Sequence, residues 1–212
     1  MPPASRSDGA VPPAPASDGA ATAAPGADRA GPLEFRLSGS GGQGIILAAT
    51  ILAEVACTAG YEVVQTQSYG PEARGGASAA EVIISRAPID FPEVERPDLT
   101  LCLSQEAFDK YAGRTRAGGL VVYDSGLVEP VGLDGRARLI GLPFTATARE
   151  LAGTPQAANM VALGALEGLL GLVGYPALVD SVHARLPRKL LEGNLKALNA
   201  GYEAARAAAP PA

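Results

Sequence analysis

Short apolar runs alternate with polar, glycine-rich segments through the middle of the chain, which predicts strands joined by turns and helices. The short runs with β-branched residues predict strands over 33–38, 61–67, 79–85, 99–103, 120–123 and 138–142. A longer stretch, 43–58, is apolar on nearly every face and predicts a helix buried on several sides. The order strand, glycine loop, helix, strand at 33–67 indicates a βαβ unit.

The C-terminal part has helical patterns, over 155–172, 176–186 and 189–208. Thr154 followed by Pro155 is typical of a helix start, and Gly174 is expected to end the first of these helices. This helix contains Gly164, Gly168 and Gly171, which lower helix propensity but let another backbone approach closely. Together the elements predict an α/β fold, a Rossmann-like open and largely parallel sheet with flanking helices.

Residues 1–32 differ in composition from the rest of the chain. They are almost entirely Ala, Pro, Gly, Ser and Asp, with too few large apolar side chains to offset the entropy of ordering. We therefore expect 1–32 to be a disordered, dispensable tail and 33–208 to form a single domain. The 212 residues and the 47% hydrophobic fraction fit one domain with a full-sized core.

Charge and apolar runs exclude several classes of protein. The net charge of −5 comes without a basic stripe or polybasic cluster, which argues against nucleic-acid and membrane-surface binding. The apolar run 161–173 contains Glu167 and is too short to span a bilayer. We expect a cytoplasmic protein.

Metal-binding and nucleophilic residues are few. Cys57 and Cys102 are far apart, and each lies in an apolar stretch, so both are expected to be buried hydrophobic residues. Two isolated cysteines cannot supply the four ligands of an iron–sulfur cluster. His183 is the only histidine and is expected at the surface. No metal ligand or catalytic residue is therefore assigned to this chain.

A glycine loop connects the first predicted strand to the first helix. Its residues Gly39, Gly41, Gly42, Gln43 and Gly44 lie within a G-x-G-x-x-G pattern, whose backbone amides at a helix start attract phosphate. A nicotinamide site also needs an acidic residue at the end of the second strand, and 65–68 has none. Two alternatives stay open: tight strand–helix packing with subunit contact, or contact with phosphate or coenzyme A.

A second glycine-rich loop follows the second strand, on the same predicted edge of the sheet as the first. Its candidate site residues are Ser68, Tyr69, Gly70, Glu72, Arg74, Gly75 and Gly76. The loop is interpreted as lying against a cofactor pocket or a partner chain, with Glu72 and Arg74 pairing to the partner, or as a solvated surface turn. Asn159 and the segment 124–126 are weaker candidates for functional contacts.

Taken together, these motifs resemble the gamma family of 2-oxoacid:acceptor oxidoreductases over 33–205. The resemblance rests on the two glycine loops, 39–44 and 67–76, and on two C-terminal segments, 159–164 and 194–203. The form of the second loop, 68–72, resembles most the 2-oxoglutarate type.

The resemblance implies the chemistry of a larger enzyme. That enzyme decarboxylates a 2-oxoacid on thiamine diphosphate, passes electrons through iron–sulfur clusters to ferredoxin, and releases an acyl-CoA. Thiamine diphosphate, Mg²⁺ and the clusters are expected on partner chains, with CoA as co-substrate. The expected partners are alpha and beta subunits and a ferredoxin-like delta subunit. The glycine loops and Asn159 are expected near the CoA or thiamine site, or at a subunit interface.

Two other hypotheses compete with this interpretation. A stand-alone Rossmann-like protein that binds a nucleotide or coenzyme A without redox activity would be a stable monomer or homodimer. A small NAD-dependent dehydrogenase is less consistent with the sequence, which lacks the ribose-binding acid and a Tyr-x-x-x-Lys pair.

Overall fold

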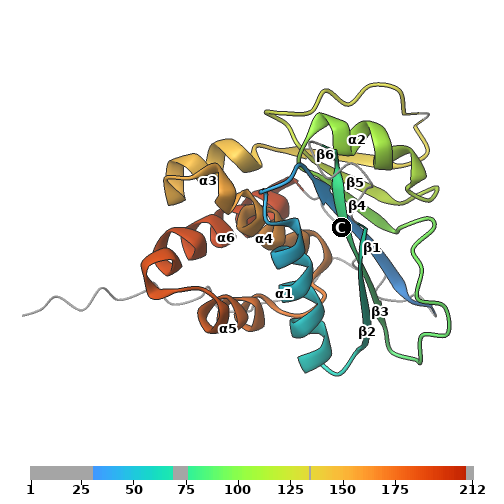
Figure 1. Ribbon diagram of the computed structural model, residues 1–212, viewed down its shortest axis with the longest axis horizontal. Coiled ribbons are helices and arrows are strands. Elements are labelled where there is room, and N and C mark those ends of the chain that lie inside the picture. The colour runs from blue at the N-terminus through green and yellow to red at the C-terminus, as the bar shows by residue number, and fades with distance from the viewer. Residues whose placement is uncertain (1–30, 69–75, 134, 209–212) are drawn as a thin grey trace, which may run out of the picture.

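A six-stranded sheet with helices on both faces organises the computed structural model, which describes residues 31–68, 76–133 and 135–208 (Figure 1). The strands are β1 (Leu33–Gly39), β2 (Glu62–Ser68), β3 (Ser78–Ser85), β4 (Leu99–Cys102), β5 (Leu120–Asp124) and β6 (Arg138–Leu142). The helices are α1 (Ile45–Thr58), α2 (Gln105–Tyr111), α3 (Phe144–Ala152), α4 (Ala158–Leu170), α5 (Tyr175–Arg185) and α6 (Arg188–Ala208). Short 3₁₀ turns cover Ala112–Arg114 and Pro155–Ala157.

The strand order is β2-β3-β1-β4-β5-β6. Strand β3 runs antiparallel to both of its neighbours, β1 and β2, whereas β1, β4, β5 and β6 are parallel. The predicted α/β fold with a largely parallel sheet is therefore confirmed. The βαβ unit formed by β1, α1 and β2 has parallel strands, but β3 lies between them.

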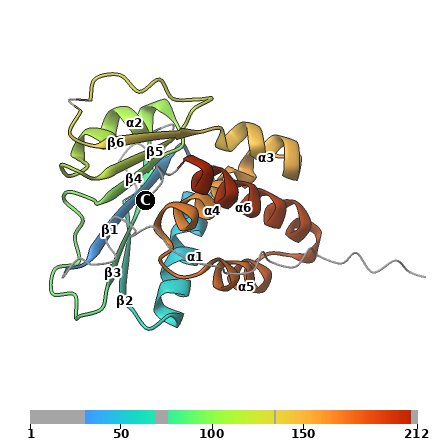
Figure 2. The same cartoon turned by 180° about the vertical axis from the view of Figure 1, so that it is seen from behind.

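The two faces of the sheet carry cores of different size. Alternate side chains such as Phe35 and Leu37 point into the larger core, which is shared with α1, α4 and α6. Figure 2 shows α1, α3, α4, α5 and α6 on this side and α2 on the other. The smaller core packs Phe108 of α2 against Cys102 and Val121 of the sheet.

Two helices were not predicted from the sequence. Helix α2 begins after Ser104, whose hydroxyl accepts a hydrogen bond from the Ala107 amide at 3.3 Å. Helix α3 begins after Pro143, and the amide of Thr145 in its first turn donates to the buried carboxylate of Asp124 at 2.9 Å. In each case a polar side chain satisfies a helix-start amide that the helix itself leaves unpaired.

Helices α4 and α6 pack with backbone against backbone. A Cβ atom added at Gly164 would overlap the carbonyl oxygen of Leu198, and one at Gly201 would overlap that of Val161. A Cβ at Gly168 would lie 2.5 Å from the Tyr202 carbonyl oxygen. The predicted close approach is therefore confirmed at Gly164 and Gly168. It is wrong at Gly171, where an added Cβ atom would meet nothing within 4 Å.

The end of α4 differs from its predicted position. The helix stops at Leu170 because Gly171 adopts a left-handed conformation with φ of 56° and donates its amide to the Glu167 carbonyl. Gly174, predicted to end this helix, instead precedes the first residue of α5.

The turn between α4 and α5 is organised by the buried carboxylate of Glu167. Its oxygens accept hydrogen bonds from the amides of Leu172, Val173 and Gly174 at 3.2, 3.1 and 2.8 Å. Burial raises the pKa of Glu167 above its ordinary value of 4.5, and the three amides oppose that shift without cancelling it.

This raised pKa predicts a pH-dependent contribution of Glu167 to stability. A carboxyl whose pKa is higher in the folded state favours folding below its unfolded pKa, and that contribution is lost as pH rises through the folded pKa. The free energy of unfolding of the wild type minus that of Glu167→Gln is therefore expected to fall as pH rises from below 4.5. Urea unfolding of both proteins across this range measures the difference, and a difference that stays flat or grows contradicts the prediction.

Candidate functional site

The loop from Gly39 to Gly44 lies at the carboxyl end of β1, where α1 begins (Figure 1). Gly41 and Gly42 are exposed, and a Cβ atom added at either would meet nothing within 4 Å. Gly42 has a φ of 87°, a conformation that favours glycine. The outer surface of this loop is thus bare backbone that faces away from the rest of the described chain.

Gln43 holds the loop from inside. Its side-chain oxygen accepts a hydrogen bond from the Ser40 amide at 2.7 Å, and its side-chain nitrogen donates to the Leu103 carbonyl at 2.9 Å. The hydroxyl of Ser78 donates to the Gly39 carbonyl at 3.2 Å. The loop is therefore tied to β3 and to the residue that follows β4. The side chain of Gln43, a predicted site residue, is engaged within the chain.

Asn159 joins the glycine loop to helix α4. It is 5% exposed, and its side-chain nitrogen donates to the Gly44 carbonyl at 3.1 Å, across 115 residues of sequence. Gly44 adopts a left-handed conformation with φ of 69°, and a Cβ there would collide with the Asn159 amide. The structure thus brings together two predicted site residues, with Asn159 supporting the loop from behind.

The start of α1 has the electrostatic character of an anion site. The first amides of a helix lack partners within it, and they carry the positive end of the helix dipole. Gly44 provides no side-chain cap, and the first turn of α1 contains no acidic residue. The bare glycine backbone beside these amides allows close approach of a phosphate or carboxylate group.

The second glycine loop begins and ends at this same edge of the sheet. The backbone of Ser68, the last residue of β2, pairs with Ala79, and Ala79 pairs with Ser38 of β1. Gly76 is partly buried just before β3. The other predicted site residues of this loop lie outside the described residues: Tyr69, Gly70, Glu72, Arg74 and Gly75.

The side chain of Asp124, a weaker candidate for a functional contact, stabilises the fold. Its fully buried carboxylate accepts hydrogen bonds from the amides of Gly126 at 3.0 Å and Thr145 at 2.9 Å, so it joins the end of β5 to α3.

The two cysteines differ in environment. Cys102 is buried, and burial raises the pKa of its thiol to about 12, which keeps it neutral and unreactive. The prediction that Cys57 is buried is wrong: it lies in the last turn of α1, on the same side as exposed Glu54, and is exposed. His183 is exposed on α5, as expected.

The described residues contain neither a cluster of metal-binding side chains nor a membrane-spanning helix. No group of three or more His, Cys, Asp and Glu side chains in this part of the chain is arranged to hold a metal ion. None of the helices in 31–68, 76–133 and 135–208 combines the length and the apolar character needed to cross a membrane.

Known proteins resemble this chain over nearly all of the described region. A family model described as pyruvate ferredoxin/flavodoxin oxidoreductase matches residues 34–204. The 2-oxoglutarate synthase subunit KorC of Methanocaldococcus jannaschii is 47% identical over 175 residues, which are 82% of this chain and 94% of that protein. The same-named subunit of Archaeoglobus fulgidus is 45% identical over 179 residues, covering 84% of this chain and 91% of that protein.

Solved structures similar to this chain come from the same class of enzyme as the sequence relatives. The gamma subunit of a keto/oxoacid ferredoxin oxidoreductase from Geobacter sulfurreducens superimposes with a TM-score of 0.75 at 44% identity, covering 84% of this chain and 99% of that chain. A 2-oxoglutarate:ferredoxin oxidoreductase from Magnetococcus marinus gives a TM-score of 0.77 at 27% identity, covering 84% of this chain and 32% of that chain. This chain therefore belongs to the pyruvate ferredoxin/flavodoxin oxidoreductase family, as a gamma-type subunit of a 2-oxoacid:ferredoxin oxidoreductase.

Proposed function

We propose that this subunit serves an enzyme that oxidises 2-oxoglutarate, and that its glycine-loop edge faces the alpha and beta subunits near bound coenzyme A or thiamine diphosphate. The observation that carries the proposal is the exposed backbone of Gly41 and Gly42 beside the uncapped start of α1. Gln43 and Asn159 fix this backbone from inside, although its outer surface contacts nothing else in the described chain. A backbone surface whose shape is fixed, and which contacts nothing else in the described residues, is available to bind a partner subunit or a ligand.

The proposed division of labour leaves the redox chemistry to other chains. Thiamine diphosphate with Mg²⁺ supplies the decarboxylation chemistry, and iron–sulfur clusters carry electrons toward ferredoxin, all on partner subunits. The part of this chain at 39–47 provides backbone amides that can orient a phosphate group of coenzyme A and exclude water from it. The second loop, with Glu72 and Arg74, is proposed to contact a partner subunit.

Two features of the relatives support this arrangement. The relatives from Methanocaldococcus jannaschii and Archaeoglobus fulgidus, at 47% and 45% identity, are named as subunits of 2-oxoglutarate synthase, which favours 2-oxoglutarate as the substrate. In the Magnetococcus marinus enzyme the matching region is only 32% of one longer chain. The counterpart of this domain is thus covalently joined there to other parts of the enzyme, as expected for a domain that works beside them.

Purification from the native host tests the proposal directly. When the full chain carries an affinity tag and is isolated anaerobically, we expect mass spectrometry to identify a thiamine-binding beta chain and an alpha chain in the same complex, together with a ferredoxin-like delta chain. The complex should reduce ferredoxin fastest with 2-oxoglutarate when compared with pyruvate and indolepyruvate, each supplied with coenzyme A.

Two outcomes contradict the proposal in different ways. If pyruvate or indolepyruvate is the faster substrate, the substrate assignment is wrong but the subunit role stands. If the chain emerges alone, folded, and binds a nucleotide or coenzyme A by itself, the stand-alone binding protein becomes the better hypothesis.

A further inference from the structure

A pocket of about 320 Å³ opens at the edge of the sheet opposite the glycine loop. Its walls come from the segments that precede β4, β5 and β6. These three strands are parallel to β1, so their starting ends lie at the edge where β1 begins, whereas the glycine loop lies where β1 ends. The pocket and the glycine loop are therefore separate features of the fold.

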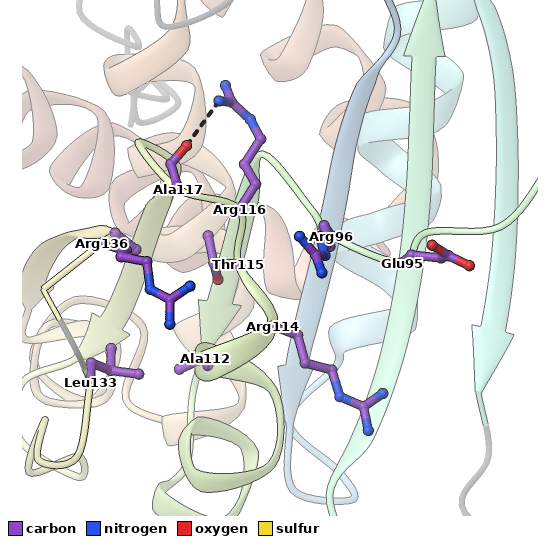
Figure 3. Close-up of a pocket in the computed structure, with 11 residues that line it drawn as sticks. Glu95, Arg96, Ala112, Arg114, Thr115, Arg116, Ala117, Leu133 and Arg136 are labelled. Atoms are coloured by element: carbon purple, nitrogen blue, oxygen red, sulfur yellow. Dashed lines mark hydrogen bonds between the residues drawn. The ribbon is translucent and has the colours of Figure 1, made fainter.

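Four arginines line this pocket: Arg96, Arg114, Arg116 and Arg136. They come from three segments, and they gather positive charge in a chain whose net charge is −5. Figure 3 shows Arg96 between Thr115 and Glu95, and Arg136 extending toward the region around Thr115 and Ala112. Arg116 turns toward Ala117, and Arg114 extends below Arg96, away from Thr115 and Arg136. Glu95 also lines the pocket, but its carboxylate points away from Thr115 and Arg136 in this view.

The backbone around the pocket is held in place by hydrogen bonds and one ion pair. Arg116 is paired with the buried carboxylate of Asp98, which also accepts from the Glu34 amide at 2.8 Å. The Arg116 amide donates to the Pro97 carbonyl at 3.1 Å, and the hydroxyls of Thr100 and Thr115 are 2.7 Å apart. The segments before β4 and β5 therefore keep their relative positions without a ligand.

The Gly118 amide extends this framework to the third segment by donating to the Arg136 carbonyl at 2.8 Å. Arg96 and Arg114 are exposed, and neither forms an ion pair with another residue of the described chain. Guanidinium groups stay charged at all ordinary pH values. Positive charges that line one pocket and form no ion pair within the described residues favour the binding of an anion there.

The shape and the donor type identify the class of anion. Guanidinium groups present N–H donors in a planar fork that matches the oxygens of phosphate, and they bind it bidentately. The volume lies at the lower end of the range for small-molecule sites. We propose that this pocket binds a phosphate-bearing small molecule, held by Arg96 and Arg114, with Arg136 lining another part of the wall. A concave site of this size fits such a ligand better than the surface of an acidic protein.

Calorimetric titration of the full chain tests this proposal with inorganic pyrophosphate, ADP and citrate as probes at low ionic strength. We expect saturable binding of pyrophosphate to the wild type, and binding about tenfold weaker or more to an Arg96→Gln, Arg114→Gln double variant. Both replaced side chains are exposed, so the variant should fold normally. Arg149→Gln, which removes an exposed arginine of α3 outside the pocket, is the matched control and should bind like the wild type.

The measured affinities decide whether the site exists and which anion it binds. Equal affinity of the double variant and the wild type overturns the site, as does the absence of saturable pyrophosphate binding. Citrate binding that is tighter than pyrophosphate binding overturns the phosphate assignment. ADP binding at least as tight as pyrophosphate supports a nucleotide-type diphosphate as the ligand, and weaker ADP binding supports free phosphate or pyrophosphate.

Discussion

Replacing Gly201 with alanine is expected to lower the free energy of unfolding by about 3 kcal/mol, because the crossing of α4 and α6 has no room for a methyl group. The new Cβ would overlap the Val161 carbonyl oxygen, a backbone atom that cannot move without displacing α4. Both helices are packed into the larger core, so neither can move away from the other without disturbing that core. Urea unfolding followed by circular dichroism gives the free energy for each protein.

Gly113→Ala serves as the control for this experiment. Gly113 lies in a 3₁₀ turn, and a Cβ atom there would meet nothing within 4 Å. Its replacement should change the free energy of unfolding by only about a few tenths of a kcal/mol. Equal effects of the two substitutions would show that the helix crossing tolerates a wider separation than the structure indicates.

Gly41→Val is expected to reduce turnover of the assembled enzyme about 100-fold, since misplacement of groups by about 1 Å has effects of this size. Unlike Gly201, Gly41 has open space beside it, so the added side chain does not disturb the fold of this chain. It projects instead from the bare surface that we propose to face a partner subunit or coenzyme A. The measurements are the thermal unfolding of the isolated chain and the rate of ferredoxin reduction by the assembled complex.

The matched control is Gly31→Val, which adds the same side chain at another exposed glycine with open space around it, before β1. Its turnover and assembly should match the wild type. If Gly41→Val assembles and turns over normally, the proposed placement of the glycine loop is wrong. If it lowers the thermal stability of the isolated chain, the loop has a structural role that its exposed surface does not indicate.

The long elements of the fold could be predicted from the sequence because each has an uninterrupted apolar pattern. Helix α2 could not, since only Ala107, Phe108 and Tyr111 of its seven residues are buried, and about two turns are too short to establish a period. The position of β3 between β1 and β2 could not be predicted from the sequence either. Both neighbours of β3 were predicted as strands, but nothing in a period-two pattern says which strands pair.

The candidate site was only partly predictable. The glycine pattern indicated which residues gather at the start of α1, but not that the side chains of Gln43 and Asn159 are directed inward. The arginine pocket could not be predicted, because its arginines come from three separate segments between 96 and 136. No local motif marks them, and only the parallel arrangement of β4, β5 and β6 brings them together.

The position of β3 beside β2 makes the two glycine loops unequal in their tolerance of length changes. The first loop runs from β1 into α1 and is tied to Leu103 and Asn159, so an inserted residue there would break these contacts or shift a helix. The second connects the neighbouring antiparallel strands β2 and β3, and the pairing of Ser68 with Ala79 already fixes both of its ends. Doubling such a connection costs only about 0.6 kcal/mol of closure entropy. A change of length between β2 and β3 should therefore leave the sheet intact, whereas the same change between β1 and α1 should not.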